Sequence, residues 1–262
     1  MSIKAILFDL DETLVVEQDS DTAAFISVCE LAHQKHGVQI ESFKKSVYKT
    51  AMKFWDNSPV INYCNAIGIG FVEGLWGRFL GDEPNLKKLR QWVPTYQRET
   101  WAGALAEHRI FDSDLIEDLT MAFYQKRRKK HLLYDDAIPI LKKLGGKFRL
   151  GIITNGAPDV QVEKIIQTNL SNFFDSIIIS GQIGVGKPGS LPFEMALSQL
   201  VVTPDATLMV GDSIEHDILG AKQLGIRTAW LNRREQRHRN SMIANYEIKN
   251  LYDLEKKLLR FR

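Results

Sequence analysis

The chain has 262 residues, of which 44% are hydrophobic, enough to bury a full core in one large domain or two smaller ones. Its 34 Lys and Arg residues nearly balance its 32 Asp and Glu residues, and the formal charge of +2 excludes the strongly basic field of a dedicated nucleic-acid-binding protein. The two cysteines, Cys29 and Cys64, form no CxxC pair and have no histidine nearby at metal-ligand spacing, so they indicate neither a disulfide scaffold nor a zinc site.

The sequence predicts no membrane segment. No stretch offers roughly 18 apolar residues without charge, as a spanning helix requires. Asp9 and Asp11 interrupt the apolar N-terminal stretch before it reaches signal-peptide length. We therefore expect a cytoplasmic protein, monomeric or homodimeric, that binds neither membranes nor nucleic acid.

The first predicted element is a short apolar strand at residues 3–10, with the composition of a strand buried on both faces of a parallel sheet. Residues 23–131 then show long helical patterns, such as 23–35 and 42–55, without the period-two alternation of a half-buried strand. This block is predicted to be all-helical.

After Tyr134, short apolar strands alternate with helices. The predicted strands are residues 149–154, 176–180, 207–211 and 227–231, and the predicted helices are residues 138–144, 159–168, 192–200 and 215–224. Such alternation indicates βαβ units and a doubly wound parallel sheet.

The first strand must belong to that sheet, because an isolated strand cannot satisfy its own backbone hydrogen bonds. The helical block is therefore an insertion after the first strand. The predicted fold is α/β, with a Rossmann-like parallel sheet core at residues 1–16 and 135–262 and an inserted all-helical domain at residues 17–134.

Polar residues gather where the predicted strands end. Ligands of open α/β sheets bind beyond the carboxyl ends of the strands, so these residues are the candidates for a functional site. They are Asp9 and Asp11 after the first strand, Thr154 and Asn155 after the next, Lys187, and finally Asp212, Ser213 and Asp217.

Asp9 and Asp11 lie two residues apart on an extended segment, so both carboxylates can point into one crevice. One can remain ionised as a nucleophile while the other serves as general acid and then general base. Such a pair alone is more typical of a turn, but a third carboxylate, Asp212, completes an oxygen-rich site suited to Mg²⁺. Together, Mg²⁺ and Lys187 would offset the charge of a bound phosphate, and backbone N–H groups at helix N-termini could bind its oxygens.

Four motifs occur in a fixed order, each just after a predicted strand or at the start of a helix. They are residues 8–13 (FDLDET), 154–156 (TNG), 187–188 (KP) and 211–217 (GDSIEHD). They resemble the four motifs of the haloacid dehalogenase superfamily. The resemblance implies a hydrolase that acts on phosphate monoesters, with Mg²⁺ as cofactor and a small phosphorylated metabolite as substrate.

For the reacting groups, the resemblance implies that Asp9 forms an aspartyl-phosphate intermediate and binds Mg²⁺ through a carboxylate oxygen. Asp11 would protonate the leaving group, then activate the hydrolytic water, and bind the metal through its backbone carbonyl. Asp212 would complete the set of metal ligands. These roles fit covalent catalysis assisted by a metal ion.

For the surrounding groups, the resemblance implies that Thr154 and Asn155 hold phosphoryl oxygens and that Lys187 neutralises both the phosphate and Asp9. Asp217 and Ser213 are expected behind the metal ligands, where Asp217 would orient a metal-bound water or Lys187.

The insertion after the first motif resembles the helical C1-type cap of the superfamily, a lid that favours a small substrate. The chain also resembles the acylneuraminate-9-phosphatase and pyrimidine-nucleotidase-like branch. Two alternatives stay open: a phosphotransferase or mutase of the β-phosphoglucomutase type, and a non-catalytic regulatory binding protein. Dehalogenases lack the second aspartate, so Asp11 argues against that branch.

Three other groups of side chains are predicted to be structural. The insertion contains four of the five tryptophans, which we expect in its own hydrophobic core: Trp55, Trp76, Trp92 and Trp101. The basic run at residues 126–131 is interpreted as a solvated helix end. Four arginines after the last predicted strand are interpreted as a solubilising surface or an interface: Arg233, Arg234, Arg237 and Arg239.

Overall fold

The computed structural model describes residues 2–129, 131–236 and 243–258 of the chain. It separates into two compact units: a sheet unit (Met1–Val16, Leu132–Gly156 and Gln161–Arg262) and a helical unit (Glu17–His131 and Ala157–Val160). The predicted domains place their second boundary after residue 134. In the structure this boundary falls after His131, and residues 157–160 group with the helical unit.

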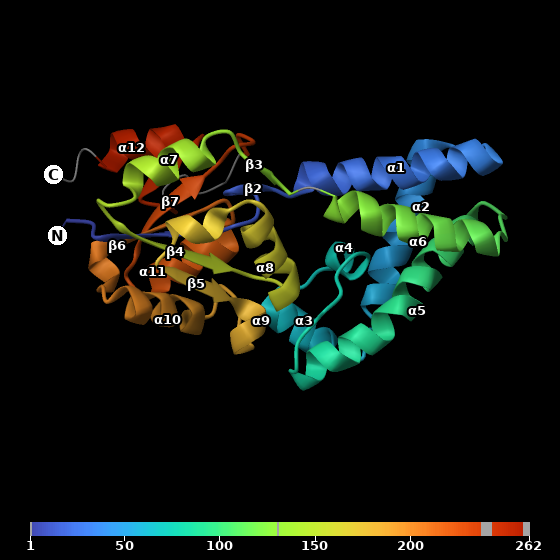
Figure 1. Ribbon diagram of the computed structural model, residues 1–262, viewed down its shortest axis with the longest axis horizontal. Coiled ribbons are helices and arrows are strands. Elements are labelled where there is room, and N and C mark those ends of the chain that lie inside the picture. The colour runs from blue at the N-terminus through green and yellow to red at the C-terminus, as the bar shows by residue number, and fades with distance from the viewer. Residues whose placement is uncertain (1, 130, 237–242, 259–262) are drawn as a thin grey trace. The chain divides into compact units, whose positions relative to one another are not determined.

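Within the described residues, the sheet unit contains a six-stranded parallel sheet in the order β5-β4-β1-β6-β7-β8. Its strands are β1 (Ala5–Phe8), β4 (Arg149–Thr154), β5 (Ser176–Ile179), β6 (Thr207–Gly211), β7 (Arg227–Leu231) and β8 (Tyr246–Ile248). The first strand lies in the middle, between strands that follow it much later in the sequence (Figure 1). The predicted α/β fold with a Rossmann-like parallel sheet is therefore confirmed.

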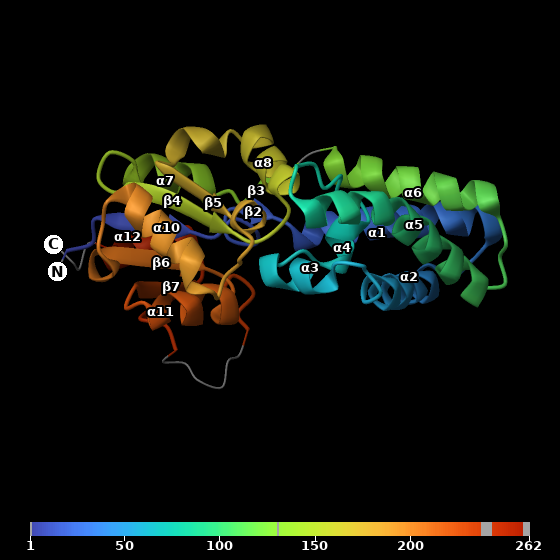
Figure 2. The ribbon, with the colours of Figure 1, turned by 90° about the horizontal axis from the view of Figure 1, so that it is seen from below.

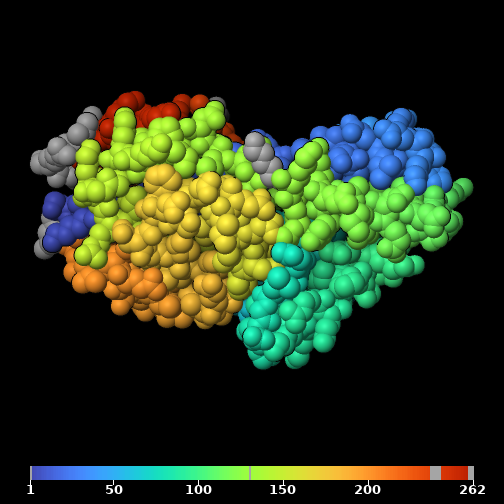
Figure 3. Space-filling view, in the orientation of Figure 1, coloured from blue at the N-terminus to red at the C-terminus, as the bar shows by residue number. Residues whose placement is uncertain are grey.

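Side chains of β1 alternate between two hydrophobic layers, which explains why the strand is apolar throughout. Ala5 and Leu7 pack with residues of α10 (Ser190–Leu200) and α11 (Gly220–Gln223) on one face of the sheet. Ile6 and Phe8 pack on the other face, against α7 (Ala137–Leu144) and α12 (Leu251–Leu258). Two views at right angles show this arrangement (Figures 1 and 2). In the space-filling view, segments from α7 to α10 cover the face of the sheet unit that is turned to the viewer (Figure 3).

Several elements of the sheet unit were not predicted. They are the antiparallel pair of β2 (Val15–Val16) and β3 (Leu132–Leu133), the edge strand β8, the helices α9 (Ser180–Ile183) and α12, and the short 3-10 helices η1 (Leu170–Phe173) and η2 (Pro204–Ala206). The predicted helix at 215–224 is instead a π-helical segment, η3 (Ile214–Leu219), followed by α11. Its wide turn is seen in the bond from Ile218 N to Ser213 O, a carbonyl five residues earlier (3.2 Å).

The helical unit has its own core. Its helices are α1 (Gln18–His36), α2 (Ile40–Trp55), α3 (Ile61–Ile67), α4 (Phe71–Gly74), α5 (Pro84–Glu107) and α6 (Ser113–Arg128). The two long C-terminal helices begin at acidic caps: Glu83 accepts a hydrogen bond from Leu86 N, and Asp112 accepts one from Leu115 N. Among the described residues, no helix is long and apolar enough to span a membrane.

The tryptophans of the insertion belong to this core, as predicted. Trp55, Trp76 and Trp101 are buried, and Trp92 packs against the same cluster while partly exposed. The rings of Trp92 and Tyr96 are stacked, with centroids 5.2 Å apart. These contacts give the four indoles a structural role.

The interpretation of the basic run at 126–131 as a solvated helix end is wrong for Arg127. This residue is 1% exposed, and its guanidinium forms ion pairs with Glu17 and Asp21. The guanidinium carbon also lies 4.4 Å from the centroid of the Trp76 ring. Because a buried charge is costly unless paired, Arg127 ties the end of α6 to the start of α1.

We predict that Arg127→Met lowers the free energy of unfolding by about 3 kcal/mol, because it leaves two acidic side chains without their buried partner. The matched control is Lys35→Met, which breaks the exposed pair of Lys35 with Asp118 and should lower the free energy of unfolding far less than Arg127→Met. Urea denaturation followed by circular dichroism measures both changes. Equal losses in the two variants would contradict the structural role assigned to Arg127.

Candidate active site

The first part of the site lies at the carboxyl end of β1. The strand ends at Phe8, and Asp9 follows it, fixed to the neighbouring strand by a hydrogen bond from its backbone N–H to Val210 O (2.9 Å). Asp9 is buried, with 8% of the residue exposed. Because β1 is the central strand, Asp9 stands where residues from neighbouring strands can reach it.

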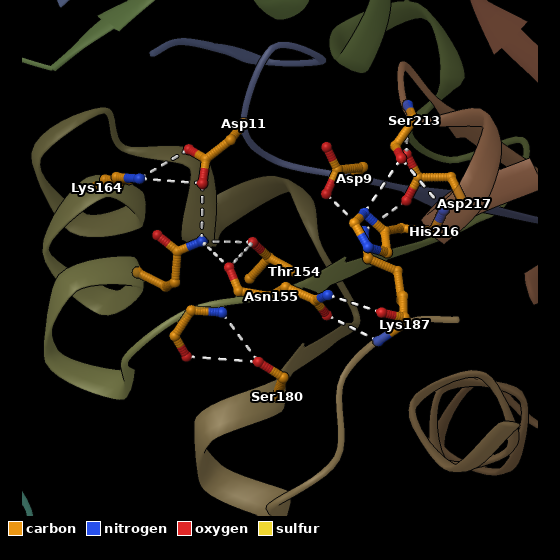
Figure 4. A network of polar contacts seen from close by, with 12 residues as sticks. Asp9, Asp11, Thr154, Asn155, Lys164, Ser180, Lys187, Ser213, His216 and Asp217 are labelled. Atoms are coloured by element: carbon orange, nitrogen blue, oxygen red, sulfur yellow. Dashed lines mark hydrogen bonds and ion pairs between the residues drawn. The ribbon is translucent and has the colours of Figure 1, made fainter. Parts of the chain in front are cut away.

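A buried lysine joins two carboxylates at this place. The Nζ atom of Lys187 lies 2.6 Å from Asp9 Oδ1 and 2.6 Å from Asp217 Oδ1 (Figure 4). Burial opposes the charged form of Lys187, but the carboxylates of Asp217 and Asp9 outweigh this effect and raise its pKa. The lysine is therefore a fixed positive charge at the centre of the site.

Asp217 is held in place by the turn that follows β6. Its Oδ2 atom accepts a hydrogen bond from Ser213 N (3.0 Å), while its Oδ1 binds Lys187. A Cβ atom at Gly211 would lie 2.2 Å from Asp217 Oδ2, so only glycine lets this carboxylate approach the strand end. Ser213 also caps η3, since its Oγ accepts a hydrogen bond from His216 N (3.1 Å).

Three carboxylates converge here: one oxygen each from Asp9, Asp212 and Asp217 lies within 4.8 Å of the others. Burial raises the pKa of Asp9 to about 7, and the charge of Asp217 adds to the rise while Lys187 opposes it. Burial, followed by the charges of Asp9 and Asp217, raises the pKa of Asp212 to about 8. The cluster thus holds more negative charge than Lys187 alone can balance.

This donor set suits a hard divalent cation. Mg²⁺ prefers carboxylate, carbonyl and water oxygens, and it commonly uses only one or two carboxylates of the protein. Asp212 is additionally fixed through its backbone, because Trp230 Nε1 donates a hydrogen bond to Asp212 O (2.8 Å). The carboxylates of Asp9 and Asp212 are therefore candidates to hold the ion.

The second predicted acid, Asp11, belongs to a different set of contacts. Its carboxylate oxygens lie 2.9 and 3.0 Å from Lys164 Nζ, and Oδ2 accepts a further hydrogen bond from Gln161 Nε2 (2.9 Å). The same Gln161 nitrogen donates to the hydroxyl of Thr154, the last residue of β4 (2.6 Å). Asp9 and Asp11 are two residues apart in sequence, yet each binds its own lysine (Figure 4).

The side chain of Asn155 binds the backbone of Lys187 at both ends of its amide. Asn155 Nδ2 donates to Lys187 O (2.9 Å), and Lys187 N donates to Asn155 Oδ1 (2.8 Å). This reciprocal pair fixes the loop that carries Lys187 to the end of β4. Whether Asn155 also contacts a phosphate, as the sequence suggested, stays a prediction.

Sequence reasoning missed Gln161 and Lys164. Both lie on α8 (Pro158–Gln167), which starts shortly after the Thr154-Asn155-Gly156 motif. The sequence offered only a weak signal, two polar residues three positions apart on one helix face, and only the structure shows that both are almost completely buried. Ser180 was also missed: its hydroxyl accepts a hydrogen bond from Gly156 N (2.9 Å) and so braces the same motif.

The arginines after β7 have specific partners rather than a solubilising role alone. Arg233 pairs with Asp136 and donates a hydrogen bond to the carbonyl of Thr13, the last residue of the first motif. Arg234 forms an ion pair with Glu12 (3.0 Å). Arg237 and Arg239 lie outside the described residues.

Comparison with known proteins finds related phosphatases over most of the chain. A phosphoserine phosphatase of Thermus thermophilus is 33% identical over 232 residues, which cover 88% of this chain and 89% of the relative. A glyceraldehyde 3-phosphate phosphatase of Pyrococcus abyssi is 42% identical over 235 residues, which cover 87% of this chain and 81% of the relative. A pyrimidine 5'-nucleotidase of Streptococcus pneumoniae, PynA, is 26% identical over 260 residues, which cover 97% of this chain and 94% of the relative.

Solved structures show the same fold. The putative hydrolase YfnB of Bacillus subtilis, in a form bound to magnesium, aligns with a TM-score of 0.66 at 21% identity, covering 99% of this chain and 100% of that one. The family model for haloacid dehalogenase-like hydrolases matches residues 3–225, which include all four motifs. The chain is therefore an enzyme that belongs to the haloacid dehalogenase-like hydrolase family, as the motifs suggested.

Proposed function

We propose that the chain is a Mg²⁺-dependent phosphomonoester hydrolase that acts on a small phosphorylated metabolite through an aspartyl-phosphate on Asp9. One observation carries the proposal: two carboxylates two residues apart are placed in different environments. Asp9 lies with Lys187 and the other clustered carboxylates, and Asp11 lies with Lys164. A nucleophile and an acid–base group need this kind of separation.

In the first step, a carboxylate oxygen of Asp9 attacks the phosphorus, and the bond between phosphorus and the leaving oxygen breaks. Asp11 gives a proton to that oxygen as it leaves. Lys187, already within 2.6 Å of Asp9, stabilises the negative charge of the transferring phosphoryl group. The Thr154 hydroxyl lies at the adjacent strand end and is assigned to bind a phosphoryl oxygen.

In the second step, water attacks the phosphorus of the aspartyl-phosphate, and the bond to Asp9 breaks. Asp11 now accepts a proton from the water, which restores its starting state and releases inorganic phosphate. The same carboxylate thus serves both half-reactions, as acid and then as base.

We assign the metal site to the carboxylates of Asp9 and Asp212 together with the backbone carbonyl of Asp11. Asp217 is assigned a supporting role, because its two oxygens already bind Lys187 and Ser213 N. A cation held there would supply charge stabilisation for the transferring phosphoryl group. It would also supply the positive charge that the carboxylate cluster lacks.

The names of the relatives support the proposed substrate class. The relatives are named for phosphoserine, glyceraldehyde 3-phosphate and pyrimidine 5'-nucleotides. All three are phosphate esters of primary alcohols in small, water-soluble molecules. This supports a small phosphorylated metabolite as the substrate of this chain as well.

We predict that the purified protein with Mg²⁺ releases inorganic phosphate from at least one of phosphoserine, glyceraldehyde 3-phosphate and uridine 5'-monophosphate. Asp9→Asn should lower kcat by at least about 1,000-fold, because the amide cannot form the covalent intermediate. A colorimetric phosphate assay over these three esters and p-nitrophenyl phosphate measures both.

The control for that experiment is Asp118→Asn, which changes an exposed carboxylate of the helical unit and should leave kcat within about twofold of the parent. If the parent releases no phosphate from any ester, and Asp9→Asn changes only ligand affinity, the regulatory alternative replaces this proposal. If the protein isomerises a sugar monophosphate in the presence of a trace of bisphosphate without net phosphate release, the mutase alternative replaces this proposal.

A second prediction concerns stability and pH in the metal-free protein. In the folded state the pKa of Asp9 is raised to about 7 and that of Asp212 to about 8, both above the ordinary value of 3.8. Between the ordinary and the raised pKa values, the folded state therefore binds more protons than the unfolded state. The free energy of unfolding should therefore fall as the pH rises from about 5 to about 8. Because Mg²⁺ requires the ionised carboxylates, its stabilising effect should be larger at pH 8 than at pH 5.5.

Differential scanning fluorimetry in EDTA and in Mg²⁺, over this pH range, measures both effects as shifts of Tm. Asp212→Asn removes one of the titrating groups and should flatten the pH dependence of the metal-free protein while reducing the gain from Mg²⁺. A parent whose Tm rises equally with Mg²⁺ at both pH values would rule out this metal site.

A further inference from the structure

Two buried polar side chains of α8, those of Gln161 and Lys164, take no part in the mechanism described above. Gln161 is 1% exposed and Lys164 is 2% exposed. They lie three positions apart, on one face of the helix. A buried ammonium group is costly unless it is paired, so the position of Lys164 requires a nearby anion.

Once Asp11 has given its proton to the leaving oxygen, its carboxylate is that anion, and both of its oxygens are bound. Lys164 Nζ lies 2.9 Å from Oδ1 and 3.0 Å from Oδ2, and Gln161 Nε2 lies 2.9 Å from Oδ2. Three contacts from two side chains fix both the place and the rotation of one carboxylate (Figure 4). By contrast, Asp9 receives its lysine from a different segment, the loop before α10.

Gln161 also connects Asp11 to the end of β4. Its Nε2 atom lies 2.6 Å from Thr154 Oγ1 and 2.7 Å from the carbonyl oxygen of Asn155. Three acceptors around this atom support its assignment as the amide nitrogen. A Cβ at Gly156 would lie 3.1 Å from Gln161 Cδ, so the glycine of the motif leaves room for this side chain.

The amide oxygen of Gln161 adds a second indication. Among the described residues it is a buried acceptor without a hydrogen-bond partner. A buried acceptor without a hydrogen bond destabilises the folded protein, and the exceptions that persist call for an explanation beyond folding. Here the explanation is that the amide is oriented so that its nitrogen donates to Asp11 and Thr154, which leaves its oxygen without a donor.

From these contacts we propose that Lys164 and Gln161 are positioning residues for Asp11, which they hold in the orientation needed to exchange a proton with the leaving oxygen and then with water. This inference rests on the proposed function, because it gives Asp11 the acid–base role. Neither residue touches the phosphoryl group in this scheme. Lys164 acts through the carboxylate of Asp11, and Gln161 acts through Asp11 and also through the hydroxyl of Thr154.

The leaving group of the substrate provides the test. An alkyl alcohol needs a proton as it leaves, whereas p-nitrophenolate leaves without one. The ratio kcat/KM reports the steps up to the formation of the aspartyl-phosphate. Lys164→Met should lower kcat/KM by about 100-fold for the alkyl ester that the parent hydrolyses best, and by less than about fivefold for p-nitrophenyl phosphate.

Two further variants keep the test independent of folding. Lys164→Arg restores a cation that can bind a carboxylate and should recover at least about tenfold of the loss with the alkyl ester. Gln161→Leu should show the same preference for the good leaving group to a smaller degree, because it also removes the contact with Thr154 and so lowers kcat/KM for both kinds of ester. Circular dichroism and the Tm of each variant establish that it is folded.

The matched control is Lys143→Met. Lys143 also pairs with a carboxylate at 2.9 Å, that of Glu255, but this pair is exposed on the sheet unit. Its removal should leave both kcat/KM values unchanged.

Failure of the inference is distinct from failure of the proposed function. If the parent hydrolyses none of the esters, the function is wrong. If the parent is active but the folded Lys164→Met variant loses the same factor on both kinds of ester, or loses nothing, Lys164 does not act through Asp11. A crystal structure of Lys164→Met with the Asp11 carboxylate unmoved would overturn the inference as well.

Discussion

The organisation of the site depends on one buried charge, the ammonium group of Lys187. A buried cation must be neutralised nearby, and here Asp9 and Asp217 do so at 2.6 Å each. These contacts join the end of the first strand, the loop before α10 and the π-helical turn after β6. Asn155 adds the end of β4 by binding the backbone of Lys187. Four segments far apart in sequence are thus fixed around one point.

Much of the sheet could be predicted from the sequence, and the reasons are physical. The strands at 149–154, 207–211 and 227–231 were predicted with the bounds that the structure shows, because strands buried on both faces read as continuous apolar runs. The two-residue strands β2 and β3 are too short to show any period. The predicted helix at 215–224 is partly π-helical, and this wider turn carries Asp217, whose carboxylate binds the backbone near the end of β6. Local helix propensity does not reflect such a tertiary contact, so the sequence could not predict the wider turn.

The site residues could be predicted to lie together from the topology of the sheet, which the spacing of the motifs alone does not give. Asp9, Asp212, Asp217 and Lys187 were expected together because parallel strands share a carboxyl edge, and they are found within hydrogen-bonding or metal-binding distance of one another. The partners of Asp11 escaped prediction because they come from the buried face of a helix, where polar residues look like interruptions of an apolar pattern. Arg127 was misread for a related reason: charge runs are usually solvated, and only the fold reveals which member turns inward.

The separate lysines of Asp9 and Asp11 explain how neighbouring carboxylates can take different roles. Two acids that shared one lysine would compete for it, and their mutual repulsion would couple their charges. Instead, Lys187 reaches Asp9 from the loop before α10, and Lys164 reaches Asp11 from α8. The relatives are named for different substrates, although all of these are phosphate esters. In the proposed mechanism, Asp9, Asp11 and Lys187 act on the phosphoryl group that such esters share. Under that mechanism, discrimination between leaving groups would come from side chains outside the four motifs.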